Sequence, residues 1–398
     1  NRMENDRPQW SNWGGLNDIF RPTSFSSDIK ATEYTFGGLL GSTNFVIRAS
    51  SWSPPYKLSV ASSNRSYRSR LMGTYVSGIS KKGIAIVASA SKRAGNEGFV
   101  SGTSYDALSG LVAIEKIIND KNSINLMMIG ALNERGKSSP NTTEVTKIKG
   151  TEYNSYWGYQ QGTVRNSRLK SIFEPVLSLS HFYETDKVSL TTNFGIQSGS
   201  IKSSRVGYYK ARNPMPDYYQ NLPSYFLRDS RYPDYENAYK ATEDLINDGQ
   251  LNWHDLYLMN NGSPEANYYV YDDRTDDTSL RFNSNLFAKL SNSLKLNAGV
   301  SFTQLNSHGY AELTDLLGAE YFIDLQDFAT DDAIQNDLNN PDRKVVIGNE
   351  FLYNYKIHAN KWGGFTQLQR TGRSIDYFLG IRINSTSAQR DGKYRNGT

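Results

Sequence analysis

The sequence predicts an all-β protein, an antiparallel β-barrel that crosses a membrane. Residues 278–303 alternate apolar and polar side chains along two long limbs, which are joined by a polar turn at residues 291–293. Alternation sustained over about a dozen residues indicates a two-faced strand long enough to cross a bilayer at a tilt. Mean hydropathy is −0.61, and no apolar run reaches the roughly 18 residues of a membrane helix. A barrel needs only every second residue to be apolar.

Residues 1–55 differ from the rest because they are rich in Trp, Gly, Pro and Asn. We expect a small globular segment there, with Pro54 and Pro55 as a hinge to the barrel region 56–398.

From Tyr56 onward the long-strand pattern repeats in eleven places. In the span 350–371 the alternation breaks at residues 359–364, where we expect a bulge or a kink. The predicted strands are 56–66, 69–80, 83–95, 104–118, 122–134, 171–183, 187–199, 278–290, 293–306, 350–371 and 374–389.

The connections between these strands alternate in length. Short polar turns alternate with longer linkers at 95–104, 135–170, 200–277 and 307–349. Short turns at one end and long loops at the other are typical of outer-membrane barrels, with the long loops extracellular. A large soluble β-protein, the alternative, has no reason to separate loop lengths in this way. Such barrels have an even number of strands, so eleven indicate that the sequence is an internal fragment of a larger protein.

Composition excludes several functions. The charge of +4 comes from 44 basic and 40 acidic residues, a balance that gives no reason to expect a nucleic-acid partner. With no cysteine, disulfides and thiolate sites are absent. The four histidines are dispersed, and no hydrolase or phosphate-binding motif occurs, so we expect no enzyme.

Two groups of residues are candidate binding sites. Aromatic faces can stack on sugars or other planar ligands, although packing of long loops is the commoner role. The aromatic candidates are Trp10, Trp13, Tyr218, Tyr219 and Tyr225. Carboxylates could hold a structural calcium ion, although solvated loop charge is the plainer interpretation. The carboxylate candidates are Asp272, Asp273, Asp276 and Asp277, placed at the end of the 200–277 loop. No other cofactor is expected. Inward charges such as Arg382 could pair with Asp18 or Asp28 of the first segment.

Several motifs resemble TonB-dependent outer-membrane receptors of the Bacteroidota, the SusC-like branch of the TonB receptor superfamily. Residues 10–18 (WSNWGGLND) and 36–50 are similar to the second half and the end of the plug domain. The loop motifs are similar at residues 96–100 (NEGFV), 157–160 (WGYQ), 213–219 (NPMPDYY), 222–225 (LPSY), 315–318 (DLLG) and 390–392 (RDG).

The resemblance implies a 22-stranded barrel with a plug inside it, of which this chain would hold about half. It implies a protein of the cell outer membrane that contacts its lipid and imports a bulky nutrient, which could be a glycan, a peptide or a metal complex. TonB, through a segment outside this sequence, and a cognate surface lipoprotein would be its partners. The alternatives are a surface receptor or secretion-associated barrel of the same fold that does not import, and a soluble extracellular glycan-binding β-protein.

Overall fold

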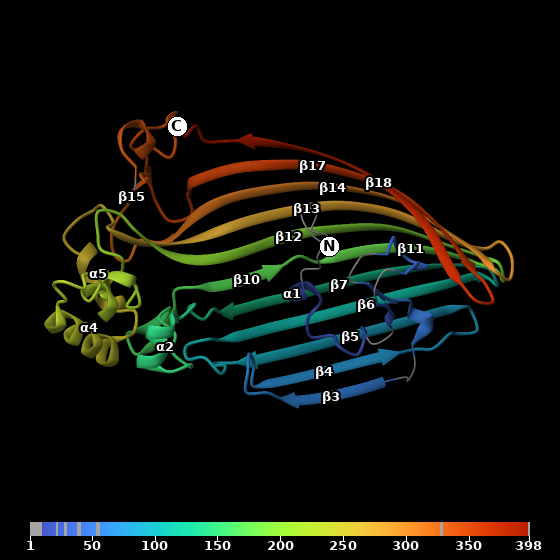
Figure 1. Cartoon of the computed structure of the whole chain (residues 1–398), viewed down its shortest axis with the longest axis horizontal. Helices are drawn as coiled ribbons and strands as arrows, with labels where there is room; N and C mark the ends of the chain where they lie inside the picture. Colours follow the sequence, from blue (N-terminus) through green and yellow to red (C-terminus); the bar gives the residue numbers. More distant parts are fainter. Residues whose placement is uncertain are drawn as a thin grey trace.

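Long strands with alternating side chains pair in sequence order into one curved antiparallel sheet (Figure 1). The computed structural model describes residues 10–20, 23–27, 30–37, 41–52, 56–326 and 329–396. The strands of the sheet are β3 (Tyr56–Ser62), β4 (Ser69–Val76), β5 (Ile84–Gly95), β6 (Tyr105–Asn119), β7 (Asn122–Gly136), β10 (Leu169–Phe173), β11 (Val176–Glu184), β12 (Val188–Tyr208), β13 (Tyr268–Lys289), β14 (Leu294–Asp315), β17 (Glu350–Thr371) and β18 (Asp376–Gly392).

Strands β10 and β11 share one position in the sheet. Both pair with β7 on one side and with β12 on the other. Glu174 and Pro175 separate them, and Pro175 has no N–H to donate to the ladder. The sheet therefore has a strand at each of the eleven predicted positions, and the prediction of a barrel wall made of sequential hairpins is confirmed.

The hairpin of β13 and β14 has the predicted register and turn. Phe282 pairs with Phe302, and the amide of Leu290 donates to the Leu294 carbonyl (2.9 Å) across residues 291–293. Apolar side chains at alternate positions point away from the face that carries the N-terminal segment, and on β18 they include Leu379, which is 76% exposed. The outer face thus carries an apolar band about nine residues tall, as strands that cross a bilayer at a tilt require.

The strands continue well past this apolar band. We predicted loops at 200–277 and 307–349, but β12 continues to Tyr208, β13 begins at Tyr268 and β14 continues to Asp315. Directly beyond the band, at residues 198–205 of β12 and 272–279 of β13, the side chains are mostly polar on both faces. The alternation that marks a strand in the sequence therefore disappears there, although backbone pairing continues. The predicted boundaries of these two loops were therefore wrong.

The irregularity predicted at residues 359–364 is also misplaced. Pairing of β17 with β14 is continuous there, and the register shifts instead at Leu352 and Tyr353, where Leu352 has a φ of +60°. Gly363 and Gly364 interrupt the side-chain pattern without interrupting the backbone ladder. The RDG motif, expected to begin a loop, is the end of β18.

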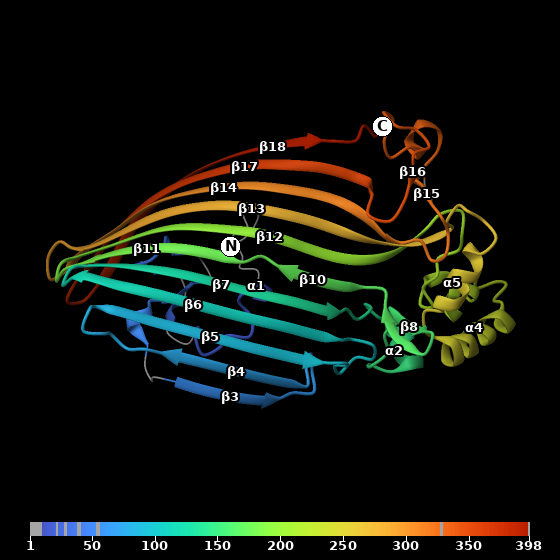
Figure 2. The same cartoon turned by 180° about the vertical axis from the view of Figure 1, so that it is seen from behind.

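The N-terminal part of the chain lies on one face of the sheet, toward the viewer in Figure 1 and behind the strands in Figure 2. We call the described residues between 10 and 52 the inner segment, and the face they contact the inner face. Leu16, Ile19 and Ala49 are fully buried against apolar inward side chains of β4 to β7. Its elements are α1 (Trp10–Trp13), β1 (Thr23–Ser26), β2 (Ser42–Phe45) and the 3-10 turn η1 (Ala49–Ser51). Pro54, Pro55 and Asp28 lie outside the described residues.

The long loops gather at one end of the sheet, opposite the short turns (Figures 1 and 2). One lobe, called the outer lobe below, includes residues 143–149 and 223–260. It packs Trp253 and Leu256 on the outward side chains of Val206 and Val270. The other lobe packs Phe322 and Val345 on the inward side chains of neighbouring strands. Loop elements are α2 (Thr143–Lys149), β8 (Trp157–Gln160), β9 (Thr163–Asn166), η2 (Tyr219–Asn221), α3 (Pro223–Phe226), α4 (Tyr235–Asp248), α5 (Trp253–Asn260), β15 (Phe322–Ile323), η3 (Asp331–Ile334) and β16 (Lys344–Val345). No helix in the described part of the chain is long and apolar enough to span a membrane.

Candidate functional site

A cavity of about 620 Å³ lies between the inner segment and the inner face of the sheet. Asn12 and Trp13 of α1 line it on one side, and inward residues of β10, β12, β13, β14, β17 and β18 line it on the other. The strands fix these side chains because every second residue must face inward. The cavity is therefore bounded both by a rigid wall and by a separate segment of chain.

Two acidic and two basic residues line this cavity: Glu174, Asp277, Lys170 and Arg281. The Asn12 amide donates to the Glu174 carboxylate (2.8 Å) and links the inner segment to the wall. Ile201, Leu305 and Ile357 supply apolar surface between the charges. Such a lining can orient a polar ligand through a few groups while it buries apolar area.

A second inward group lies nearer the loops on the same strands. Arg205 pairs with Asp273, and the Tyr353 hydroxyl donates to the same carboxylate (2.8 Å). The guanidinium of Arg390 lies over the Tyr355 ring at 4.9 Å. This group continues the polar inner wall toward the loop end of the sheet.

The inner segment is fixed to β6 by a buried ion pair. Arg48 Nε donates to Glu115 Oε1 (2.7 Å), and the Ser50 amide donates to the other oxygen (2.9 Å). Glu115 is fully buried, so this carboxylate depends on these donors in place of water. Arg48 also contacts Glu184 (2.7 Å).

The pairing expected between Arg382 and Asp18 does not form. Asp18 accepts from Lys57 Nζ at 2.7 Å, whereas Arg382 Nε donates to Asn384 (3.2 Å) on its own strand. Lys57 begins the wall close to the point where the inner segment ends, so the nearer cation occupies the carboxylate.

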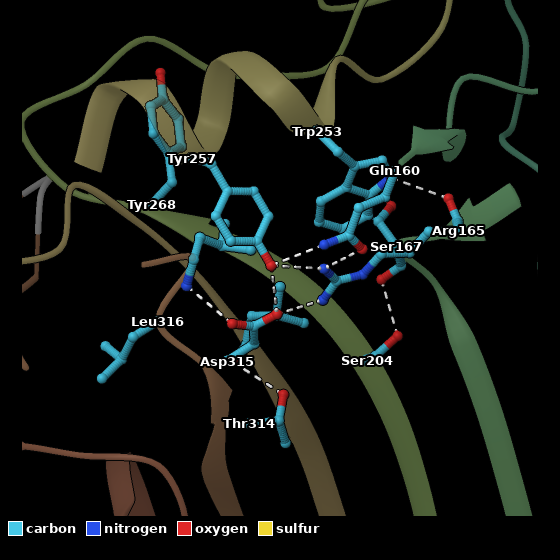
Figure 3. Close-up of polar contacts among 12 residues, drawn as sticks. Gln160, Arg165, Ser167, Ser204, Trp253, Tyr257, Tyr268, Thr314, Asp315 and Leu316 are labelled. Carbon is cyan, nitrogen blue, oxygen red and sulfur yellow. Dashed lines mark hydrogen bonds and ion pairs between the residues drawn. The ribbon is translucent and has the colours of Figure 1, made fainter. Parts of the chain in front are cut away.

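Figure 3 shows a polar cluster that fastens the outer lobe to the end of β14. Arg165 Nη2 pairs with Asp315 Oδ2 (2.7 Å), and its Nη1 donates to Gln160 Oε1 (2.9 Å). Trp253 donates its indole N–H to the Arg165 carbonyl (3.0 Å), and its ring lies 4.0 Å from that guanidinium. The WGYQ and DLLG motifs, far apart in sequence, meet here. Because these donors and acceptors satisfy one another, the cluster holds the lobe in place.

The aromatic candidates occupy two separate regions. Trp13 lines the cavity and packs on Phe20 (5.8 Å between ring centroids), whereas Trp10 is mostly exposed beside Phe45. Tyr218, Tyr219 and Tyr225 form a row with centroids 4.7 and 5.8 Å apart at η2 and α3. The structure therefore places only Trp13 of the five at the cavity, and a ligand role for the tyrosines stays a prediction.

The half-buried carboxyl of Asp217 directly precedes this row of tyrosines in the chain. Burial raises the pKa of the Asp217 carboxyl, although a hydrogen bond with the Ser155 side chain opposes the shift. Burial, and to a lesser extent the charge of Asp217, raises the pKa of Tyr153. The outer lobe therefore contains a titrating group that is isolated from the cavity.

The acidic candidates do not share a loop. All four lie within β13: Asp272, Asp273, Asp276 and Asp277. Because successive residues of a strand face opposite sides of the sheet, Asp272 and Asp276 face outward while Asp273 and Asp277 face inward. Asp273 contacts Arg205 and Tyr353 on the inner face, and Asp276 contacts Tyr310 and Arg274 on the outer face. No group of three or more potential metal ligands was found among the described residues. Their placement in a loop was wrong, and calcium binding by any of them stays a prediction.

Arg48, Glu115 and Glu174 were not predicted as site residues. Glu115 is the one acid among the inward positions of β6, which are otherwise apolar, small or aromatic. A single charge on an apolar strand face was the signal available in the sequence. Its partner could not be identified because Arg48 lies in an irregular stretch with no periodicity.

No family model matches the sequence, and no curated protein matches it. Solved structures do resemble the fold. The ferric-catecholate import receptor Fiu from E. coli K12, in its open form, has a TM-score of 0.55 at 10% identity, covering 93% of this chain and 50% of that one.

Two further structures are similar. The ferripyoverdine receptor of the outer membrane of Pseudomonas aeruginosa has a TM-score of 0.52 at 10% identity, covering 91% of this chain and 41% of that one. The ferric citrate transporter FecA, unliganded, has a TM-score of 0.52 at 6% identity, covering 88% and 40%. This chain thus spans half or less of each structure. The fold of this chain is therefore that of part of a β-barrel wall with a segment of chain packed on its inner face.

Proposed function

We propose that the protein is a TonB-dependent outer-membrane receptor that imports a bulky nutrient by energy-coupled movement of its plug. The observation that carries the proposal is the cavity between the inner segment and the wall. A ligand in that cavity touches the segment that would have to move for passage. In this role the residues bind and gate, so no catalytic group is needed. The apolar outer band would contact outer-membrane lipid.

The cargo class and the branch of the superfamily are part of the proposal. The names of the similar structures describe receptors for ferric complexes, which favours a metal complex over a glycan or peptide. The sequence motifs favour the SusC-like branch of the Bacteroidota, with a surface lipoprotein as a partner. Trp13 at the cavity and the row formed by Tyr218, Tyr219 and Tyr225 would be the aromatic contacts for cargo.

The proposal is tested by linking the inner segment to the wall. The chain has no cysteine, so Asn12→Cys with Glu174→Cys creates two thiols at positions whose native side chains are 2.8 Å apart. A bis-methanethiosulfonate reagent can bridge them, and reduction reverses the bridge. Uptake of radioactive iron supplied as a ferric siderophore, and of a fluorescent oligosaccharide, is then measured in cells with and without TonB. We expect bridging to abolish TonB-dependent uptake and reduction to restore it.

The matched control bridges two adjacent wall strands. Ser198→Cys with Thr278→Cys joins exposed positions on β12 and β13 whose hydroxyls are 3.0 Å apart, and uptake should continue. Uptake that persists without TonB, or in the bridged Asn12/Glu174 protein, would contradict import by plug movement. Those results would favour a receptor or secretion barrel that does not import. A protein that stays monodisperse without detergent would instead favour the soluble glycan-binding alternative.

A further inference from the structure

A second inward-facing cavity, of about 630 Å³, lies at the loop end of β6 and β7. Its charged lining residues are Arg65, Arg135 and Lys137, and no Asp or Glu is among the described residues that line it. Tyr105, which lines the same cavity, pairs across the strands with Arg135. The cavity therefore has a purely cationic charge set, although the whole chain carries only +4.

Two further arginines, Arg93 and Arg70, lie on the same inner face next to Tyr105. The guanidinium of Arg93 is 5.2 Å from the Tyr105 ring centroid and 5.9 Å from that of Tyr67. Arg93 pairs across β4 and β5 with Arg70, and like charges directly opposite each other are unfavourable unless something neutralises them. An anion near this wall would relieve that repulsion.

Several donors on this wall have no acceptor. Arg70 Nε, Arg93 Nε and Nη2, and Ser91 Oγ are buried without a hydrogen-bond partner among the described residues. Each unpaired buried donor is costly, and arginine forks match the paired oxygens of phosphate and carboxylate. By contrast, the cations of the first cavity lie among carboxylates, because Glu174 and Asp277 line it with Lys170 and Arg281.

We propose that this basic pocket binds an oxyanion group, phosphate or carboxylate, of a soluble molecule that enters from the loop side. Arg65, Arg135 and Lys137 would contact the anion, while Arg70 and Arg93 raise the positive potential behind Tyr105. The pocket faces the interior of the barrel and not the lipid, so the anion comes from solution. Assigning the anion to the imported cargo rests on the proposed function; the binding itself does not.

Arg93, which contacts the Tyr105 ring at the edge of the pocket, also contacts the inner segment. A Cβ at Gly14 would lie 3.0 Å from Arg93 Nη2, and one at Gly15, whose φ is +93°, would lie 3.0 Å from Arg93 Nε. The guanidinium is therefore packed on the Gly14–Gly15 turn. An anion in the pocket that attracts the Arg93 guanidinium would therefore affect a side chain that contacts both the inner segment and the wall.

The test is calorimetric titration of the purified protein in detergent with inorganic pyrophosphate and, separately, with citrate. We expect saturable binding that weakens as salt is added, and a loss of at least about tenfold in affinity for Arg135→Gln with Lys137→Gln, since both charges and one fork are removed. Lys137 is exposed and Arg135 only half-buried, so this variant should fold. Comparing the two anions identifies phosphate or carboxylate as the preferred group.

The matched control is Lys92→Gln, because Lys92 precedes Arg93 on β5 but pairs with Asp106 on the outer face. It should bind pyrophosphate and citrate like the wild type. Absence of saturable binding of either anion, or equal affinity in the control and the double variant, would overturn the proposal. Loss of anion binding with uptake unchanged would separate this pocket from cargo import, and loss of uptake with anion binding intact would leave the pocket standing without the proposed function.

Discussion

The inner segment contacts two parts of the wall in different ways. Against β4 to β7 it buries Leu16, Ile19 and Ala49 on an apolar inner face, next to the Arg48–Glu115 ion pair. Toward β13 to β18 the contacts of its described residues are mainly polar: the Asn285 amide donates to the Tyr34 carbonyl (3.1 Å), the Asn297 amide donates to the Thr32 carbonyl, and the Phe36 ring meets Phe365.

This difference indicates which side of the segment is the anchor. Apolar burial and a buried ion pair hold it to β4–β7, whereas a cavity lies between α1 and the inward residues of β10 and β12–β18. Exposed or half-exposed hydrogen bonds contribute only about 0.5–1.5 kcal/mol each. Movement of the segment should therefore begin on the β13–β18 side while the β4–β7 side holds.

The largest effect is expected from breaking the buried ion pair. Arg48→Ala leaves Glu115 buried with the Ser50 amide as its remaining inner-segment donor, and we expect undocking of the inner segment to become easier by about 3–5 kcal/mol. Urea titration, with protease cleavage of the inner segment as the readout, measures this. Adding Glu115→Gln to Arg48→Ala should recover part of the loss, because the uncompensated charge is removed. Strictly additive effects of the two substitutions would contradict a coupled pair.

A smaller difference should separate apolar contacts on the two sides. Leu16→Ala opens a cavity in the fully buried cluster and should cost about 3 kcal/mol in the same assay. Phe36→Ala removes a partly exposed ring 6.1 Å from Phe365 and should cost about 1 kcal/mol. Equal losses for the two variants would show that the inner segment is held evenly, and the anchor interpretation would fail.

The smallest effect concerns the outer lobe, which should be independent of both sides. Burial raises the pKa of Asp217 above its ordinary value of 3.8. Protonation of Asp217 therefore stabilises the folded outer lobe. This stabilisation is fully present below the unfolded-state pKa of the carboxyl and is lost as pH rises through its folded-state pKa. The protection of the α3 and α4 amides against hydrogen exchange, relative to the unfolded chain at the same pH, should increase on acidification through this range in the wild type. The increase should be smaller in Asp217→Asn. Asp229→Asn, an exposed loop variant, serves as control, and docking of the inner segment should be unaffected by either substitution.

Alternation in the sequence predicted the wall because membrane-spanning strands must present apolar side chains to lipid at every second position. The hairpin from Leu280 to Phe302 shows this directly, since its register and turn are those expected. The same criterion missed the continuation of β12, β13 and β14 toward the loop end of the sheet, because the side chains directly beyond the apolar band are mostly polar on both faces. It also placed Asp272 and Asp273 together in a loop, although adjacent residues of a strand point to opposite faces.

The candidate site was less accessible to sequence reasoning. Trp13 was predicted and lines the cavity, but Glu174 and Arg281 were not predicted as partners of α1 in lining it. Arg165 and Asp315 are 150 positions apart and meet only because their loops fold onto one another. Contacts between irregular segments leave no periodic signal, so no pattern in the chain indicates them.

The outer face and the order of the strands follow from the sequence alone, because contact with lipid imposes a strict period of two and short turns pair neighbouring strands. The role of each inward side chain depends on the packing of the folded chain. An inward side chain can be apolar beneath the inner segment, paired like Glu115, or uncompensated like Arg93. Which of these applies depends on the segment that covers it.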